Sequence, residues 1–199
     1  MISERQIQER ESRKERILDG ALTVFKEQGI EKATMDEIAR EAGFGKATLY
    51  YYYSSKEEIF SSILEDGWTK IWERIEPAIH EHNNPKETFL KLLTIIAKLV
   101  NEKRVLYEFL FSAPHSMPEM LDPNQPWKKF QNRMYSVLQG LVEEGISANQ
   151  FPNVDPKLLL KGLGGLFHGV LFLGNQNVPI TDTAIEKFFT QFLGTMNTE

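Results

Sequence analysis

The 199-residue chain contains no cysteine, which excludes disulfide bonds and thiolate metal sites and is compatible with a reducing compartment. It also lacks a long hydrophobic run. The best candidate, residues 158–173, is interrupted by Lys161 and His168 and falls short of the roughly 20 apolar residues that span a membrane. The first ten residues are polar and lack the apolar core of a signal peptide. We therefore expect a cytoplasmic protein with no membrane partner.

Catalytic and metal-ligating patterns are also missing. Two of the four histidines are two residues apart and cannot share a helix face, and the others lie far away in the sequence. No nucleophile stands in a recognisable relation to a base. We expect no catalytic residue, no metal and no cofactor. The histidines are His80, His82, His115 and His168.

The net charge of −5 argues against indiscriminate binding to nucleic acid, but the charge is unevenly distributed. Residues 1–56 hold ten basic and ten acidic side chains, so the whole excess lies in residues 57–199. A neutral N-terminal part on an acidic body is compatible with specific, local contact to DNA.

Helical periodicity runs through the whole chain, and no alternating strand pattern is visible. We predict an all-α fold of about nine helices. We also predict that the chain divides into two helical parts, residues 1–56, with three helices, and residues 57–199. The proline-rich segment 113–126 is predicted to be a loop or lid.

The most informative segment is residues 34–60, which predicts two short helices, a tight turn and the start of a long helix. Thr34 and Glu37 have the spacing of a capping box, and Gly43 stands where a helix ends in a left-handed residue. Ser55 and Glu58 predict a second capping box at the long helix. This succession is typical of a helix-turn-helix.

The second short helix, residues 46–52, is barely two turns long and is crowded with a lysine, a threonine and tyrosines. Such a helix cannot bury all of these side chains, so most must face outward. We predict that Leu49 and Tyr53 are buried. The rest form a surface for binding, for which DNA is the best candidate.

The segment resembles the DNA-binding end of the TetR family, the tetracycline-repressor-like bacterial transcription regulators. The run of tyrosines at 50–53 replaces residues that are often histidine and phenylalanine in the family, so the preferred DNA sequence cannot be read. The resemblance covers about a quarter of the chain. It rests on Arg16-Ile17-Leu18, Ala21-Leu22, Phe25, Gly29, Thr34, Ile38-Ala39, Ala42-Gly43, Thr48-Leu49-Tyr50, Tyr53, Ser55-Lys56-Glu57 and Phe60.

The resemblance implies that residues 1–56 form a helix-turn-helix DNA-binding domain and that residues 57–199 form a helical domain for effector binding and dimerisation. It also implies that the helix at 46–52 enters the major groove of a palindromic operator. Lys46 matches a position that often contacts base edges, while Tyr50, Tyr52 and Lys56 match positions that hold phosphates. The role of Tyr51 stays open. The basic residues among Arg5–Arg16 form either a flexible arm on DNA or a solvated helix face. The predicted DNA-binding residues are Thr34, Gly45, Lys46, Ala47, Thr48, Tyr50, Tyr52 and Lys56.

Glycines on a helical pattern near the C-terminus indicate close packing of two helices. Gly162, Gly165 and Gly169 share one face, and each costs about 1 kcal/mol of helix propensity relative to alanine. A phosphate loop would need glycines in a turn between a strand and a helix, which this pattern lacks. Because the family dimerises through its last two long helices, the resemblance places these glycines in a homodimer interface.

The resemblance also implies an effector pocket in the helical body, lined in part by aromatic residues whose default role is core packing. We predict Trp68, Phe109, Met134 and Phe167 as lining residues. The predicted function is a transcriptional repressor, released from DNA by a small apolar or amphipathic effector, with the long helix from Lys56 as the lever. The alternative is an all-helical ligand-binding or protein-interaction module without an operator.

Overall fold

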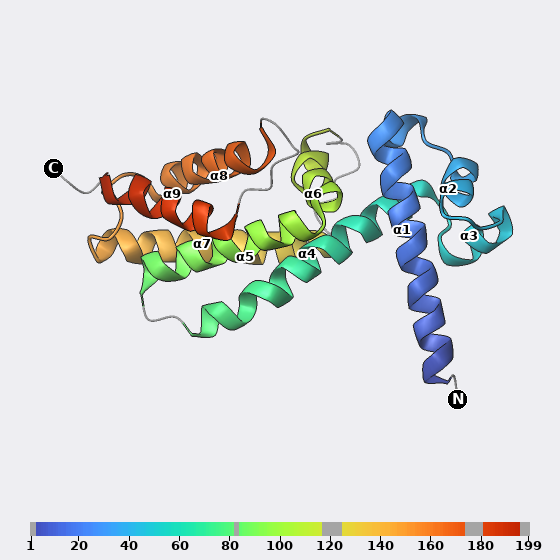
Figure 1. Ribbon diagram of the computed structural model, residues 1–199, viewed down its shortest axis with the longest axis horizontal. Helices are drawn as coiled ribbons and strands as arrows, with labels where there is room; N and C mark the ends of the chain where they lie inside the picture. The colour runs from blue at the N-terminus through green and yellow to red at the C-terminus, as the bar shows by residue number, and fades with distance from the viewer. Residues whose placement is uncertain (1–2, 82–83, 117–124, 174–180, 196–199) are drawn as a thin grey trace. The chain divides into compact units, whose positions relative to one another are not determined.

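The computed structural model describes residues 3–81, 84–116, 125–173 and 181–195, and within these ranges it contains helices and no strand (Figure 1). The predicted all-α fold is therefore confirmed. The helices are α1 (Glu4–Lys32), α2 (Met35–Glu41), α3 (Lys46–Tyr52), α4 (Lys56–His80), α5 (Pro85–Glu102), α6 (Arg104–Ser116), α7 (Pro126–Ser147), α8 (Pro156–Phe172) and α9 (Asp182–Thr195).

The chain forms two compact units. The first comprises Met1–Gly67 with Phe109–Trp127, and the second comprises Trp68–Glu108 with Lys128–Glu199. The boundary between them falls inside α4 and not at residue 56. Because this grouping reflects packing alone, the predicted functional division into residues 1–56 and 57–199 stays a prediction.

The first helix is longer than its periodicity predicts. We expected residues 9–28, but Ser3 caps a helix that starts at Glu4, and the Gln6 side chain completes a capping box there. Gly29 has a positive φ of 78° and interrupts the regular helix at its expected end, after which one more turn reaches Lys32. The basic residues between Arg5 and Arg16 therefore lie on a helix and not in a flexible arm.

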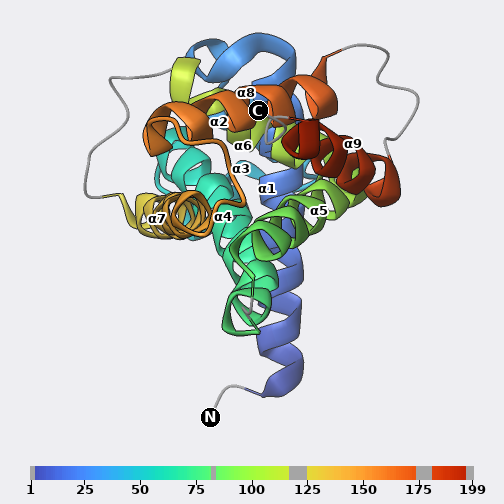
Figure 2. The same cartoon turned by 90° about the vertical axis from the view of Figure 1, so that its left-hand side faces the viewer.

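The first unit is built on α1. α2 packs against α1, and α3 packs against α2. The N-terminal turns of α1 extend past both short helices, as Figures 1 and 2 show. Ile17, Ile38 and Leu49 are fully buried and join the three helices in one small core. Each comes from a different helix, so the core fixes α3 through its single buried leucine.

A second cluster in the first unit is aromatic. Phe25 and Phe109 stack with ring centroids 6.2 Å apart, and Phe60 meets the Phe109 ring edge-on at 5.7 Å. Phe109 is one of the four residues predicted for the effector pocket. In this structure, its ring packs against rings from α1 and α4.

The second unit packs α5 against α9 and, over a shorter stretch, against α8. Side chains cap two of its helix starts, since Asn84 accepts a hydrogen bond from the Glu87 amide and Asp155 accepts one from the Leu158 amide. The guanidinium of Arg133 in α7 lies 4.1 Å above the Trp72 ring of α4. These contacts give the unit a core of its own.

The proline-rich segment differs from its prediction at its start. Residues 113–116 are the last turn of α6 and not part of a loop. Residues 117–124, with Pro118 and Pro123, lie outside the described residues, as do His82 and Gly174.

None of the helices in the described ranges is long and apolar enough to cross a membrane. Among the same residues, no group of three or more His, Asp or Glu side chains is arranged to hold a metal ion.

Candidate DNA-binding site

The helix-turn-helix begins with the predicted capping box of α2. The Thr34 hydroxyl accepts a hydrogen bond from the Glu37 amide at 3.3 Å, and the Glu37 carboxylate accepts one from the Thr34 amide at 2.9 Å. The Thr34 hydroxyl also donates to this carboxylate. Together these bonds lower the pKa of Glu37. The hydroxyl proposed to contact phosphate is therefore first of all a helix cap.

The turn between α2 and α3 is fixed from both sides. Gly43 has φ of +71°, and the Phe44 amide donates to the Ala39 carbonyl at 2.8 Å, which closes the end of α2. From α1, Arg16 donates to the Ala42 carbonyl at 3.1 Å, and its guanidinium lies 4.5 Å from the centre of the Phe44 ring. Arg16 thus supports the turn and is not free to act as a DNA-binding arm.

A close helix contact sets the distance between α1 and the turn. A Cβ atom at Gly20 would lie 2.8 Å from the Ala42 backbone nitrogen and 3.0 Å from its Cα. Only glycine fits at this position, because the two nearest atoms belong to the Ala42 backbone and cannot move aside. The approach brings α2, and with it the turn, against α1.

The side chains of α3 divide as predicted into one buried pair and an exposed face. Leu49 is fully buried and Tyr53 is 7% exposed, so these two predictions are confirmed. Tyr50 and Tyr51 are 47% and 75% exposed. Tyr51 meets Tyr52 edge-on, with ring centroids 5.3 Å apart. The exposure of Tyr51 places it on the same outward surface, although no contact was predicted for it.

Lys46, predicted to reach base edges, is held by a partner that the sequence did not reveal. Its ammonium lies 2.8 Å from Oδ1 and 3.0 Å from Oδ2 of Asp36, at the start of α2. Both side chains are more than half exposed. The hydrogen bond and the charge of Asp36 raise the pKa of Lys46, so the lysine is fully charged at neutral pH.

Lys56, predicted to hold a phosphate, has a structural role. Its ammonium donates to the Glu31 carbonyl at 2.8 Å and to the Ala33 carbonyl at 2.9 Å. These carbonyls follow the break at Gly29, where the helix no longer supplies donors to all of them. Lys56 therefore ties the start of α4 to the end of α1, and one of its three N–H groups is left for other contacts.

The second predicted capping box is shifted by one residue. Ser55 accepts a hydrogen bond from the Glu58 amide at 3.2 Å, as expected. The Glu58 carboxylate, however, accepts from the amide and hydroxyl of Ser54, each at 2.7 Å, and not from Ser55. These bonds lower the pKa of Glu58 and fix the segment that joins α3 to α4.

A surface hollow of about 420 Å³ gathers half of the predicted DNA-binding residues. Of these, Thr34, Lys46, Tyr50 and Lys56 line it, whereas Gly45, Ala47, Thr48 and Tyr52 do not. Gly45 caps α3 without a side chain, Ala47 is exposed and Thr48 is half-buried. The full lining is Ala33, Thr34, Met35, Asp36, Lys46, Tyr50, Ser54, Ser55, Lys56 and Glu57.

Tyr52 lies away from this hollow, on the side of α1. Arg13 makes an ion pair with Glu9, the main reason why the pKa of Arg13 is raised, and Tyr52 adds a smaller contribution through a hydrogen bond. Tyr52 is therefore close to a basic residue of α1. This proximity connects α1 with the exposed face of α3.

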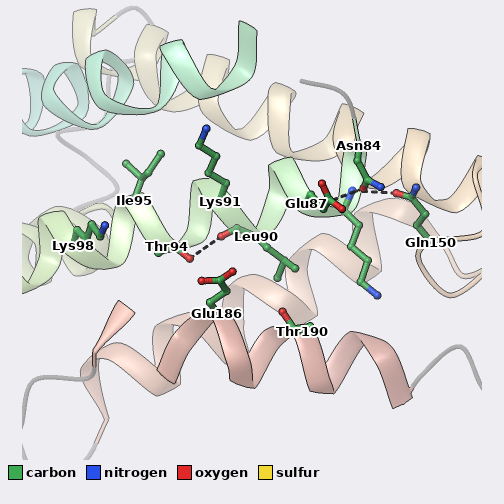
Figure 3. Close-up of a pocket in the computed structure, with 11 residues that line it drawn as sticks. Asn84, Glu87, Leu90, Lys91, Thr94, Ile95, Lys98, Gln150, Glu186 and Thr190 are labelled. Carbon is green, nitrogen blue, oxygen red and sulfur yellow. Dashed lines mark hydrogen bonds between the residues drawn. The ribbon is translucent and has the colours of Figure 1, made fainter. Parts of the chain in front are cut away.

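The second unit has a groove of its own, of about 790 Å³, between α5 and α9 (Figure 3). Most of its lining residues are lysines and other polar side chains, together with Leu90 and Ile95, and Glu186 and Thr190 face α5. None of the four residues predicted for the effector pocket lines it. Trp68, Met134 and Phe167 are buried in the second unit, and Phe109 belongs to the first.

The predicted dimer residues lie on α8. Gly162 and Gly165 are exposed, and a Cβ atom on either would meet nothing within 4 Å; at Gly169 it would make an ordinary contact with Leu173. On α9, the exposed rings of Phe188 and Phe192 stack with centroids 6.1 Å apart. Nothing in a single chain requires glycine at residues 162 and 165.

Comparisons with known proteins agree on one family. Residues 17–63 match the family described as bacterial regulatory proteins, tetR family. The HTH-type transcriptional regulator YfiR of Bacillus subtilis (strain 168) is 25% identical over 189 residues, which cover 88% of each chain. IcaR of Staphylococcus epidermidis, a negative transcriptional regulator of the biofilm operon icaADBC, is 31% identical over 105 residues, or 52% of this chain and 56% of IcaR.

Among solved structures, AibR in complex with isovaleryl coenzyme A and operator DNA has the same fold. The TM-score is 0.76 at 19% identity, with 91% of this chain and 97% of AibR covered. The family match begins at Ile17 and ends at Ile63, so it contains the capping box of α2, the turn at Gly43 and the whole of α3. The chain is a member of the TetR family of DNA-binding transcriptional regulators.

Proposed function

We propose that the protein is a homodimeric repressor that binds a palindromic operator with one α3 helix per subunit. The observation that carries this proposal is the outward face of α3, where Lys46 and Tyr50 stand exposed on a helix fixed by Leu49 and by the turn at Gly43. A short helix held this rigidly presents its side chains in one geometry, which base readout requires. Half-sites of such a dimer lie about 34 Å or a multiple apart.

The proposed contacts follow the geometry of the first unit. Lys46 donates to guanine O6 and N7, Ala47 and Thr48 reach neighbouring base edges, and Tyr50 and Tyr52 contact phosphates. Thr34 and Gly45 contribute at the helix starts. Lys56 contributes mainly by holding α4 against the end of α1. A phosphate contact through its remaining N–H group is part of the proposal.

The dimer is proposed to form through α8 and α9. Two features support this interface: the open glycines at 162 and 165, and the exposed pair Phe188 and Phe192. Glycines in a helix lower its stability, and this cost is offset where a second backbone comes close. Two helices per subunit would bury well above roughly 1,000 Å², enough for a stable dimer.

The effector is proposed to be a small apolar or amphipathic molecule bound in the helical body, with Trp68, Phe109, Met134 and Phe167 as candidate contacts. The structure of AibR, which holds isovaleryl coenzyme A together with operator DNA, supports an acyl derivative. Repression is supported by the name of IcaR as a negative regulator. Binding of the effector would favour a dimer whose reading heads no longer match the half-sites.

The test is a selection of genomic DNA fragments with the purified protein, followed by binding titrations on the recovered fragment at several salt concentrations. We expect log K to fall steeply with log salt, because phosphates are neutralised. Lys46→Ala should lower the affinity by about 1–3 kcal/mol and relax preference at one base position. Lys129→Ala, which removes an exposed lysine of α7, is the matched control and should leave binding unchanged.

Two results would contradict the proposal. No enriched fragment, together with weak and salt-insensitive binding, would favour the alternative of a ligand-binding or interaction module. If Lys46→Ala bound the operator as tightly as the unmodified protein, the assignment of α3 as the reading helix would be wrong.

A further inference from the structure

An acidic residue lies where a DNA-binding surface would least be expected to have one. Asp36, in the first turn of α2, contacts the Lys46 ammonium with both carboxylate oxygens, at 2.8 and 3.0 Å. Both residues line the hollow that also contains Thr34 and Tyr50. A carboxylate at this place repels phosphate oxygens and partly cancels the charge of the lysine next to it.

The position of Asp36 is not explained by helix capping. The first turn of α2 contains two acids, and Glu37 makes the capping bonds to Thr34 and also accepts from the Gln28 side chain at 3.0 Å. Asp36 has no part in that network, and both of its carboxylate oxygens contact the Lys46 ammonium. An acid in the first turn also complements the positive end of the helix dipole, but only the pair with Lys46 accounts for the direction of the Asp36 side chain.

The ion pair between Lys46 and Asp36 is weak enough for a competing acceptor to break it. Side-chain exposures of 60% for Lys46 and 63% for Asp36 mean that water and salt screen the interaction. The two acceptor atoms of a guanine edge can replace the two carboxylate oxygens one for one. A phosphate of random DNA replaces the two contacts of Lys46 with Asp36 less well. The Asp36 carboxylate repels the phosphate, and the two groups compete for the same ammonium.

We propose that Asp36 is a specificity-determining residue, which keeps Lys46 from the phosphates of random DNA and releases it to a base edge with two acceptors. This inference rests on the proposed function, since it requires that α3 reads DNA. It predicts that Asp36 lowers non-specific binding more than operator binding. The residue thus contributes to discrimination and not to affinity.

The test compares Asp36→Asn with the unmodified protein on two duplexes of equal length, the fragment recovered from the genomic selection and a random sequence, at about 0.1 M salt. Asparagine keeps the size of the side chain and removes its charge. We expect about fivefold tighter binding to the random duplex, an operator affinity within about twofold, and hence about fivefold poorer discrimination.

Three further variants separate the pair from a general charge effect. Asp36→Glu retains a carboxylate that can reach the ammonium and should restore most of the discrimination. Asp19→Asn removes an exposed acid from α1 and serves as the matched control, with discrimination unchanged. In the Lys46→Ala background, Asp36→Asn should no longer alter discrimination, because the partner is gone. Thermal unfolding of each variant verifies that it is folded.

The outcomes distinguish this inference from the proposed function. Discrimination within twofold of the unmodified protein for Asp36→Asn, while Lys46→Ala still weakens operator binding, would overturn the inference alone. A loss of discrimination that persists in the Lys46→Ala background would overturn it as well, because Asp36 would then act through its own charge. An unmodified protein with no preference between the duplexes would overturn the proposed function and this inference with it.

Discussion

The two units use glycine in helices in opposite ways. In the first unit, Gly20 of α1 faces the backbone of Ala42 so closely that a Cβ atom would lie 2.8 Å from it. In the other unit, Gly162 and Gly165 of α8 face open space, with nothing within 4 Å. The same residue type, in the same kind of element, has a close neighbour in one case and none in the other.

The difference indicates where packing within a single chain explains the glycine and where it does not. Around Gly20, helix, turn and side chains from one chain account for the glycine. At Gly165, glycine lowers the helix propensity of α8 although no neighbouring atom requires it. The same unit also exposes the rings of Phe188 and Phe192 on α9. We infer that the packing around Gly20 is complete in the folded single chain, and that the surface around Gly165 is covered only when two subunits assemble.

Gly165→Leu should separate the subunits of the proposed dimer while each subunit stays folded. A leucine side chain would keep two backbones apart at a place where the single chain has room for it. We expect a cost of about 3 kcal/mol at the interface, or roughly a hundredfold weaker dimer, from overpacking on both copies. Sedimentation at micromolar concentration measures the change, with Gly140→Leu in α7 as control, because that site is also open. A dimer of unchanged strength would place the interface elsewhere.

Gly20→Ala should destabilise the first unit by about 1–3 kcal/mol. The added methyl group meets main-chain atoms of Ala42, and this strain exceeds the gain of about 1 kcal/mol in helix propensity. Urea unfolding measures the loss. The same substitution at Gly140 has no neighbour to meet and should instead add about 0.5–1 kcal/mol. Equal effects at the two sites would contradict the contact described.

Lys56→Met should lower the stability of the first unit by about 1–2 kcal/mol, because two hydrogen bonds from a charged donor to carbonyls are lost while most of the side-chain volume remains. Lys56→Arg should recover part of the loss. Operator binding is measured alongside. A stable variant whose salt dependence is flatter by about one unit would show that the ammonium serves a phosphate and not the carbonyls.

The smallest effect concerns pH. The Thr34 bonds lower the folded-state pKa of Glu37 below its ordinary value of 4.5, so the stability they provide is complete above that value. It is lost as the pH falls from 4.5 through the lower folded-state pKa. Glu37→Gln should reduce the stability difference between pH 6 and pH 3, which urea titrations at the two pH values measure. An unchanged difference would mean that this carboxylate contributes nothing to acid unfolding.

Local signals in the sequence predicted much of the helix-turn-helix in the first unit. The capping box of Thr34 and Glu37, the left-handed Gly43 and the burial of Leu49 each depend on residues a few positions apart. The helical class and most helix ends follow from the same kind of signal. The shifted capping bond to Ser54 shows the limit, since two adjacent serines offer the same chemistry to Glu58.

Contacts between distant residues could not be predicted. The bonds of Lys56 to carbonyls of residues 31 and 33 depend on how α4 meets α1, and the pairing of Lys46 with Asp36 depends on the angle between two helices. The sequence around a lysine does not show which acceptor its ammonium will contact in the folded protein. Aromatic residues pose the same difficulty, because Phe109 packs in the first unit although its neighbours in sequence extend into the second.

The ties that hold the helix-turn-helix also bear on how it forms. Lys56 closes a loop of 23 to 25 residues and Arg16 one of 26, and contacts so near in sequence form quickly. The ring of Phe109 joins Phe25 and Phe60 across a much longer stretch of chain. On the ribosome, we expect α1, α2 and α3 to assemble soon after residue 56 emerges. The aromatic cluster then closes only after about another fifty residues, up to Phe109, have been made. A nascent chain would therefore hold a folded helix-turn-helix whose neighbouring aromatic core is still incomplete.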